Sequence, residues 1–195
     1  HIVSQIGYMI MGLALGGVAA ISATIFYMLH HIPVKTSLFL VEGIVERETG
    51  SSTLGRVSGL ARRSGPMAAL FLIPALSLAG LPPFSGFLGK TAVVTEGNDQ
   101  RSWWIVAAAL AVSLMTLVSM LKIWSGAFWG APDPAPAEGE HAGILRKYPM
   151  RPATTTAVVS LTPVSAAFGG PLYRFSERAA TDVTDPASYT AAVLP

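Results

Sequence analysis

Five apolar segments, separated by glycine, proline and charged residues, constrain the fold of this 195-residue chain more than any other feature. They cover residues 2–15, 18–46, 66–95, 103–129 and 152–172. A helix needs about 20 mostly apolar residues to cross a bilayer. Only 12% of the residues are charged, whereas soluble domains carry about a quarter. We therefore predict an all-α fold, a polytopic transmembrane bundle of about five helices.

The third apolar segment should form a discontinuous helix. It is interrupted by Gly80-Leu81-Pro82-Pro83 and again by Gly86 and Gly89. The residues from Met67 to Ala79 are too few to cross about 30 Å of hydrocarbon at about 1.5 Å per residue. Irregular backbone at this depth is tolerated only where it is buried in protein or lines a cavity, and in transporters such breaks build ion sites. We expect the chain to unwind within the membrane.

Lysine and arginine residues concentrate in two connections that should share one side of the bundle. Segments 47–63 and 130–151 hold Arg47, Arg56, Arg62, Arg63, Arg146, Lys147 and Arg151. The opposite side holds Arg101, Arg174 and Arg178. Because cytoplasmic loops are enriched in basic residues, the two richer connections are predicted to be cytoplasmic, with an extended loop over 131–143. We expect a transmembrane domain over residues 1–172 and an external tail over 173–195.

The second apolar segment carries a stripe of polar residues. Tyr27, His31 and Lys35 are four residues apart, and Glu42 lies seven residues beyond Lys35, on nearly the same helix face. An ionisable pair near the middle of a span is costly unless it is hydrated or paired. We predict that His31 and Lys35 face protein or water and relay protons. A hydrogen bond to a neighbouring helix explains His30 more simply, and proximity to water at the cytoplasmic end explains Glu42.

Two further lysines interrupt apolar sequence. Lys90 directly follows the predicted helix break, and a partly desolvated lysine can exchange its proton. The alternative is that its long side chain reaches the lipid headgroups, but the surrounding glycines and prolines favour a functional role. Lys122 lies near the cytoplasmic end of its segment. A side chain that reaches the lipid headgroups explains this position at least as well as a functional role does. Ser4 and Gln5 are expected to hydrogen-bond a neighbouring helix.

Several chemistries find no support in the sequence. The chain has no cysteine, so disulfides and Cys-based zinc or iron–sulfur sites are excluded. Nucleotide-binding, zinc-protease and Ser-His-Asp patterns are absent from it. His30 and His31 are adjacent and point to different sides of a helix, so they form a poor metal pair. We expect no cofactor and no metal site, and the dispersed basic residues argue against nucleic-acid binding.

Several stretches occur along the chain in a characteristic order. They are His1-Ile2-Val3-Ser4-Gln5-Ile6-Gly7-Tyr8-Met9, His30-His31-Ile32-Pro33-Val34-Lys35, Leu81-Pro82-Pro83-Phe84-Ser85-Gly86-Phe87-Leu88-Gly89-Lys90, and Lys122-Ile123-Trp124 with Ala127-Phe128-Trp129-Gly130. In this order they resemble the proton-translocating antiporter family. That family includes subunits of Mrp-type sodium/proton antiporters and the antiporter-like membrane subunits of respiratory complex I. The chain is most similar to D-type Mrp subunits, by its His-His-x-x-Val-Lys pattern and its stretch Asp185-Pro186-Ala187-Ser188-Tyr189 with Ala192-Val193-Leu194.

The resemblance implies a larger subunit in which lysines, histidines and one acid form a hydrated proton path along the membrane midplane. In that pattern Lys90 matches the terminal lysine on a discontinuous helix, and His31 and Lys35 match the connecting residues. An earlier broken helix, a glutamate and another lysine would lie upstream. The chain opens within an apolar run at His1, without the features of a signal peptide, so we expect the C-terminal part of such a subunit.

The sequence is compatible with three functions. The first is a subunit of a cation/proton antiporter in the plasma membrane, which exchanges H⁺ and Na⁺ within a hetero-oligomeric complex of antiporter subunits. The second is a proton-pumping membrane subunit of an NADH-quinone oxidoreductase or a membrane-bound hydrogenase. The third is a structural membrane subunit in which Lys35 and Lys90 serve helix packing. None gives this chain a redox centre, and in the first the chain is a transporter subunit and not an enzyme.

Overall fold

A bundle of helices is described by the computed structural model for residues 2–51, 53, 54, 57–130, 150–185, 187 and 190. Every regular element in these ranges is helical, which confirms the predicted all-α class. The elements are α1 (Ile2–Leu15), α2 (Gly17–Thr49), α3 (Leu60–Arg63), α4 (Gly65–Ala79), α5 (Ser85–Asp99), α6 (Trp103–Ile123), the π-helical turn η2 (Trp124–Phe128), α8 (Met150–Ala167) and α9 (Gly169–Thr184). The predicted extended loop over 131–143 lies outside the described residues.

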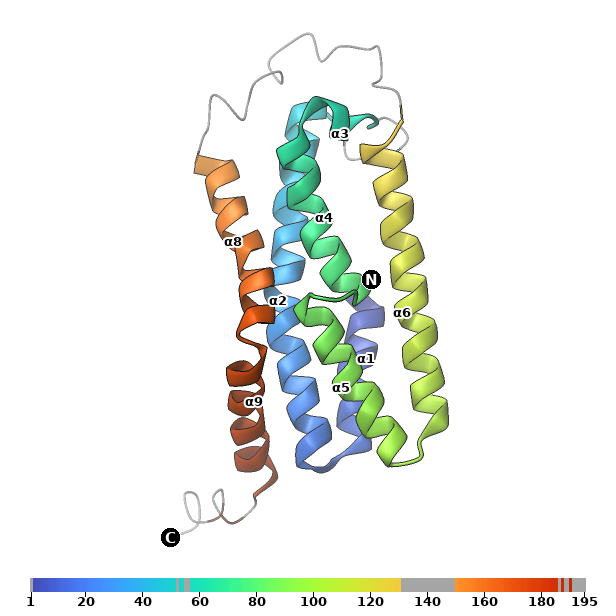
Figure 1. Cartoon of the computed structure of the whole chain (residues 1–195), viewed down its shortest axis with the longest axis vertical. Coiled ribbons are helices and arrows are strands. Elements are labelled where there is room, and N and C mark those ends of the chain that lie inside the picture. The colour runs from blue at the N-terminus through green and yellow to red at the C-terminus, as the bar shows by residue number, and fades with distance from the viewer. Residues whose placement is uncertain are drawn as a thin grey trace.

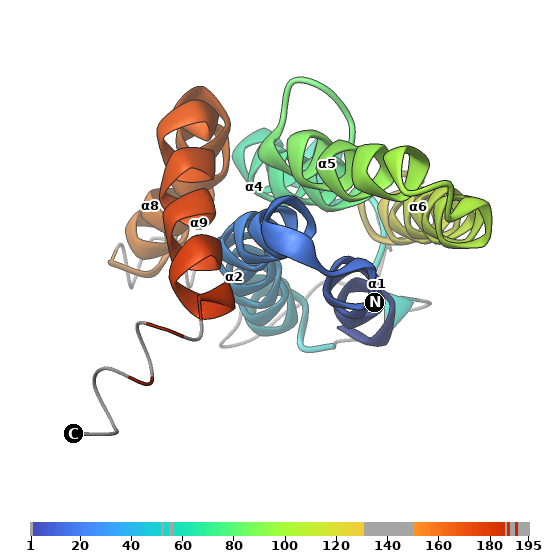
Figure 2. The ribbon, with the colours of Figure 1, turned by 90° about the horizontal axis from the view of Figure 1, so that it is seen from below.

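Helix α2 is the central element of the bundle. It packs against α1, α4, α5, α8 and α9, which lie to its left, above it and to its right when the bundle is seen from one end (Figure 2). Two pairs of shorter helices follow one another along the long axis, α4 with α5 and α8 with α9 (Figure 1). The five predicted spans therefore correspond to α1, α2, α4–α5, α6–η2 and α8–α9.

The length of α2 and α6 suits a membrane. Residues 17–47 of α2 and residues 103–128 of α6–η2 are long and apolar enough to cross a bilayer. Helix α2 stays helical across Pro33, and the hydroxyls of Thr36 and Ser37 donate to backbone carbonyls one turn earlier. Because these hydroxyls are satisfied within the helix, they can be placed in an apolar environment at little cost.

The third span is broken, as predicted, between Ala79 and Ser85. Helix α4 ends at Ala79, where Gly80 takes a left-handed conformation with φ 85°, and α5 begins at Ser85. The peptide bond between Pro82 and Pro83 is cis. The chain therefore leaves and re-enters helical structure over residues 80–84, about halfway along the bundle (Figure 1).

The second predicted interruption, at Gly86 and Gly89, is wrong. Both glycines lie within α5, and their role is close packing. A Cβ atom on Gly86 would lie 1.8 Å from the carbonyl oxygen of Ser77, and one on Gly89 would lie 2.7 Å from the ring of Tyr27. The missing side chains let α5 approach α4 and α2, so these glycines are required by the packing and do not break the helix.

The predicted boundary between membrane domain and tail at residue 172 falls inside α9. This helix continues to Thr184 and packs along α2, so residues 173–184 are helical. Their placement outside the membrane stays a prediction.

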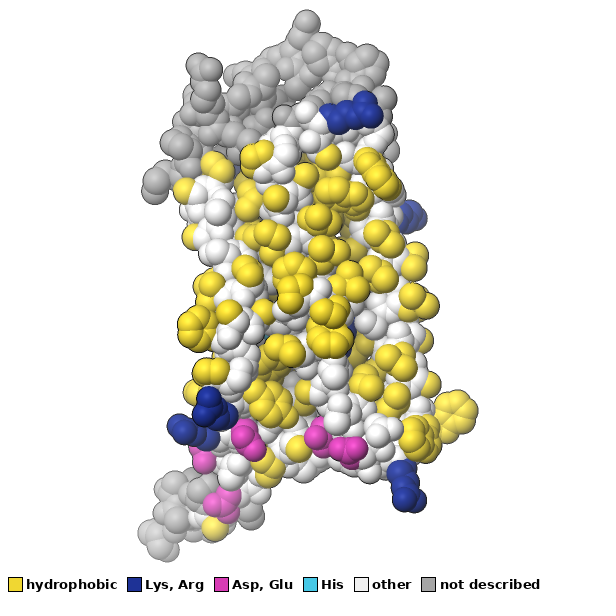
Figure 3. Space-filling view, in the orientation of Figure 1, with side chains coloured by type: hydrophobic (Ala, Val, Ile, Leu, Met, Phe, Trp, Pro, Cys, Tyr) yellow, Lys and Arg dark blue, Asp and Glu magenta, His cyan; other side chains and the backbone are white. Residues whose placement is uncertain are grey.

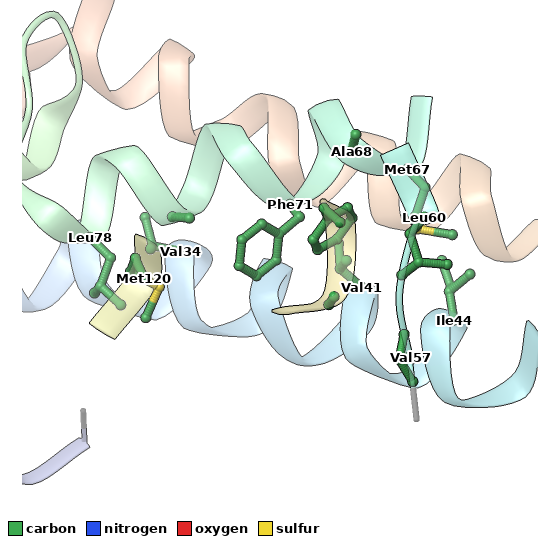
Figure 4. Close-up of a cluster of buried hydrophobic side chains, with 13 residues drawn as sticks. Val34, Val41, Ile44, Val57, Leu60, Met67, Ala68, Phe71, Leu78 and Met120 are labelled. Carbon is green, nitrogen blue, oxygen red and sulfur yellow. The ribbon is translucent and has the colours of Figure 1, made fainter. Parts of the chain in front are cut away.

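One core cluster joins α2 to α4 and the end of α6. Val34, Val41, Phe71, Leu78 and Met120 are among its buried members (Figure 4). In the same region the rings of Phe71, Trp124 and Phe128 stack, with centroids 4.7 to 6.3 Å apart. This cluster fixes the first half of the broken helix against α2.

The face of the bundle that Figure 3 shows is largely apolar along its middle, and charged side chains gather near its lower end. Large hydrophobic side chains on α6 are exposed, among them Leu114, Met115 and Val118. Trp103 and Trp104 at the start of α6 and Trp129 after its end are also exposed. An apolar belt flanked by tryptophans is typical of a protein whose surface faces lipid.

The helix ends that flank the two basic connections share one end of the bundle, and the cytoplasmic placement of that end stays a prediction. Helix α3, the end of α6 and the start of α8 share one end of the bundle (Figure 1), and the backbone N–H of Gly59 donates to the carbonyl of Trp129. The connection between α5 and α6 and the end of α9 lie at the opposite end (Figure 1).

Candidate functional site

Lys90 lies inside the bundle at the helix break. Its side chain is only 6% exposed, and its Nζ atom lies 2.9 Å from the carbonyl oxygen of Leu78 and 3.1 Å from that of Ala79. The hydroxyl of Ser113, on α6, accepts a third hydrogen bond at 3.3 Å. Lys90 therefore points inward, and the alternative that it reaches the lipid headgroups does not hold.

The broken helix supplies the acceptors that hold Lys90. The last carbonyls of a helix have no N–H partner within the helix, and they carry the negative end of its dipole. Because α4 stops at Ala79, two of these carbonyls are free to bind the ammonium of a residue in α5. Ser113 completes the arrangement, since its hydroxyl also donates to the carbonyl of Ala79 at 3.2 Å.

An aromatic ring covers the same lysine. The Nζ atom lies 5.2 Å from the ring centroid of Tyr8, within the range of a cation–π interaction. The hydroxyl of Tyr8 donates to the backbone carbonyl of Ala109, which ties α1 to α6. The described partners of Lys90 are thus all uncharged, so the lysine can lose or gain a proton without breaking an ion pair.

His30 lies against the start of α5. It is fully buried, and its Nδ1 atom lies 2.8 Å from the hydroxyl of Ser85. The Nε2 atom is buried without a hydrogen-bond partner among the described residues. The sequence prediction that His30 bonds a neighbouring helix is confirmed, and that helix is the second half of the broken one.

His31 and Lys35 are half-buried. The ring of His31 stacks on Tyr27, with centroids 6.4 Å apart and planes at 21°. Lys35 lines a cavity of about 330 Å³ together with Phe71 of α4 and Met120 of α6. Lys35 therefore faces α4 and α6, whereas the ring contact of His31 is with a residue of its own helix, and neither side chain is fully enclosed.

Glu42 and Lys122 lie away from the helix break. Both are exposed, and Glu42 lines the cavity that Lys35 also lines, two helical turns along α2. Lys122 is at the end of α6, where a lysine can reach the headgroups. Within the described residues, no three His, Asp or Glu side chains lie close enough together to hold a metal ion.

Sequence reasoning assigned no role to Tyr8 or Ser113. Both lie in apolar helices. The sequence signal that could have pointed to Ser113 is its spacing of three residues from Thr116, which places two polar groups on one face of α6. Gln5 was expected to bond a neighbouring helix, and it donates to the hydroxyl of Thr116 at 3.3 Å. That prediction is confirmed.

Comparisons with known proteins give one consistent family. Residues 2–116 match the family described as "NADH:quinone oxidoreductase/Mrp antiporter, TM". The chain is 38% identical over 194 residues to the D subunit of the Na⁺/H⁺ antiporter of Alkalihalophilus pseudofirmus, and this match covers all of the chain and 38% of that protein. It is 35% identical over 133 residues to the N subunit of the NADH-quinone oxidoreductase of Desulforudis audaxviator, covering 68% of the chain and 26% of that protein.

Solved structures give the same fold. The Mrp complex from a Dietzia species matches with a TM-score of 0.85 and 35% identity, covering 98% of this chain and 43% of that one. A membrane-bound sulfane sulfur reductase, an archaeal respiratory membrane complex, matches with a TM-score of 0.80 at 23% identity, covering 97% of this chain and 37% of that one. The second likeness shows the fold alone. The chain spans less than half the length of each of these relatives.

Proposed function

Since the chain belongs to the NADH:quinone oxidoreductase/Mrp antiporter membrane family, we propose that it is part of a cation/proton antiporter subunit. In this proposal Lys90, His31 and Lys35 carry protons through the membrane-embedded bundle. The subunit acts as a transporter and not as an enzyme, and it exchanges H⁺ for Na⁺. It works in the plasma membrane within a complex of other antiporter subunits.

The observation that carries the proposal is the environment of Lys90. A lysine 6% exposed within an apolar bundle is costly, and intramembrane ionisable residues mark ion pathways. Its ammonium is held by the free carbonyls of a helix that stops in mid-bundle, the arrangement that discontinuous helices provide for ions in transporters. A lysine that served only packing would need no such break.

The cavity beside Lys35 supports an approach to the site from one end. It extends from Lys35 past Glu42 to Ser51 and Val57, at the end of the bundle that we predict to be cytoplasmic. Most of its lining is apolar, so the proton would cross it through water and not along side chains. His31 is one helical turn before Lys35 on α2, and its ring stacks on Tyr27.

A second candidate function rests on the likeness to the N subunit of an NADH-quinone oxidoreductase. In that case the same residues would move protons in a redox-driven complex, or in a membrane-bound hydrogenase. The chemistry at Lys90 would be unchanged, and the source of energy would differ. The higher identity to an antiporter protein over the entire chain favours the first proposal.

Sodium/proton exchange in inverted membrane vesicles tests the proposal. The full-length protein is assembled with its partner subunits, and dissipation of a proton gradient on addition of NaCl is followed with a fluorescent dye. Lys90→Ala and Lys90→Arg should both abolish exchange, because arginine keeps its proton at all relevant pH values. Lys122→Arg, the matched control on an exposed lysine, should retain it.

Two results would count against the proposal. Exchange that persists in Lys90→Arg at the wild-type rate would show that only the positive charge is needed. Exchange that is lost together with assembly of the complex would show that Lys90 holds helices together, as a buried charged residue can. A wild-type complex that pumps protons only with a reduced electron donor would favour the second candidate function.

A further inference from the structure

His31 and Lys90 lie on different helices, and the ring of Tyr27 contacts both His31 and the residue before Lys90. No hydrogen bond joins these two residues within the described part of the chain. Tyr27 is fully buried, and its ring stacks on His31 at 6.4 Å. The same ring packs against Gly89, the residue before Lys90, where an added Cβ would lie 2.7 Å from it. Tyr27 thus contacts both parts of the candidate site.

A second ring continues this contact. Tyr27 and Tyr8 lie with their centroids 5.4 Å apart, and Tyr8 is the ring that covers the ammonium of Lys90. The two tyrosines therefore form an aromatic wall that extends from the histidine on α2 to the lysine on α5.

The hydroxyl of Tyr27 is held in one orientation. It donates to the side-chain oxygen of Gln5 on α1, and the amide nitrogen of Gln5 donates to the hydroxyl of Thr116 on α6 at 3.3 Å. Thr116 in turn donates to the carbonyl of Val112 at 2.8 Å. Gln5 and Thr116 are 0% and 2% exposed, so this chain of hydrogen bonds is enclosed by protein.

The direction of these bonds decides what the hydroxyl can do. Each hydrogen in the chain is donated away from Tyr27, towards α6. Among the described residues no group donates to the phenolic oxygen, so its lone pairs can accept a hydrogen bond from a protonated group or from water. A buried hydroxyl with a fixed donor direction and a free acceptor side is suited to stabilise a positive charge that passes it.

We infer that Tyr27, oriented by Gln5 and Thr116, is a positioning residue for proton transfer between His31 and Lys90. This inference rests on the proposed function. The hydroxyl accepts a hydrogen bond from the proton carrier while it donates to Gln5, and Tyr27 itself stays neutral throughout. The proton that leaves one titratable group arrives at the other, so the step needs no further reactant.

The experiment compares variants of the full-length subunit in its assembled complex, in inverted vesicles. Tyr27→Phe keeps the aromatic wall and removes the hydroxyl, and Thr116→Val keeps the volume of Thr116 and releases Gln5. Tyr173→Phe is the matched control, because Tyr173 packs against Phe26 of α2 at 5.8 Å and is not among the described partners of Lys90. Exchange is measured in H₂O and D₂O over a range of pH.

We expect Tyr27→Phe to lower the maximal exchange rate about tenfold, the effect of one lost hydrogen bond of ordinary strength. The solvent isotope effect should rise, because proton transfer then limits the rate, and the sodium concentration for half-maximal rate should stay unchanged. Thr116→Val should give a smaller loss of the same kind. Tyr173→Phe should match the wild type in rate and in isotope effect.

A wild-type rate in Tyr27→Phe would overturn the inference. A lower rate with an unchanged isotope effect and pH profile would also overturn it, since that pattern indicates that Tyr27 only supports the packing of the helices. Lys90→Ala separates this failure from failure of the proposed function. If Lys90→Ala stops exchange and Tyr27→Phe does not, only the inference is wrong; if Lys90→Ala exchanges normally, the proposed function is wrong and the inference with it.

Discussion

The Nζ atom of Lys90 lies 2.9 Å from the carbonyl oxygen of Leu78, so the second half of the broken helix binds the open end of the first. Two costs offset each other in this contact. Unpaired helix-end carbonyls are unfavourable in an apolar interior, and so is a lysine without partners. Each group supplies the hydrogen bonds that the other lacks, which makes the helix break and the lysine interdependent.

Removing the third partner of Lys90 should weaken exchange without unfolding the protein. Ser113→Ala leaves the ammonium with two backbone acceptors, and one lost hydrogen bond of about 1 kcal/mol should lower the exchange rate several-fold. Ser113→Thr keeps the hydroxyl and should restore most of the rate. Exchange in vesicles checks this, with Ser125→Ala, an exposed serine near the end of the same span, as the control. Equal rates in Ser113→Ala and wild type would show that the hydroxyl is dispensable.

Adding one methyl group at Gly86 should destabilise the complex strongly. The new Cβ would lie 1.8 Å from the backbone carbonyl of Ser77, and backbone cannot move aside as a flexible side chain can. Overpacking of this kind costs about 1–3 kcal/mol or more. Gly43→Ala is the matched control, because a Cβ there meets nothing within 4 Å. In thermal unfolding of the purified complex, the midpoint temperature should be lower for Gly86→Ala than for the wild type and unchanged for Gly43→Ala. Equal midpoint temperatures for all three would contradict the packing described for α5.

A change at Gly80 should displace the side chain of Lys90 by direct contact. Gly80→Ala places a Cβ 2.7 Å from the Lys90 side chain, in a residue with φ 85°. A left-handed conformation costs an alanine about 1–2 kcal/mol. Gly50→Ala places an alanine in the same left-handed region, at φ 69° and ψ 10° after the end of α2, so it controls for backbone strain alone. Exchange should fall in Gly80→Ala and persist in Gly50→Ala, and a similar loss in both would assign the effect to backbone strain.

Lys35 and Lys122 both lie in apolar helices but should behave differently. Lys35→Met should abolish exchange, because Lys35 lines the cavity beside α4 and α6 and methionine fills the same space without a titratable group. Lys122→Met should retain most of the activity, since Lys122 is exposed at the end of α6. The comparison is made in vesicles with equal amounts of assembled complex. Retained exchange in Lys35→Met would remove Lys35 from the path.

The helix break shows which backbone features a sequence pattern can predict and which it cannot. The run from Gly80 to Pro83 predicted the break because its cause is local: prolines cannot donate the helical hydrogen bond, and glycine adopts the left-handed turn. Gly86 and Gly89 look the same in sequence, yet they are helical. Their cause is the distance to Ser77 and Tyr27, which depends on how separate helices pack.

The candidate site also contains residues that the sequence identifies and residues that only the helix packing identifies. Lys90, His31 and Lys35 were identifiable because an ionisable residue in an apolar run is conspicuous by itself. Tyr8, Ser113 and Thr116 were not, since tyrosine, serine and threonine are ordinary in membrane helices. Only the contacts across α1, α5 and α6 distinguish them, such as the hydrogen bond from Lys90 to Ser113.

The sequence by itself determined that this protein is an all-helical membrane bundle with a broken helix and a few intramembrane charges, because hydropathy, proline and charge act over a few neighbouring residues. The tertiary structure decided which groups those charges meet. Lys90 binds carbonyls at Leu78 and Ala79, and His30 meets Ser85, through the packing of helices distant in sequence. Hydrogen bonds are short and directional, so such partners follow from the relative placement of helices, which no single segment encodes.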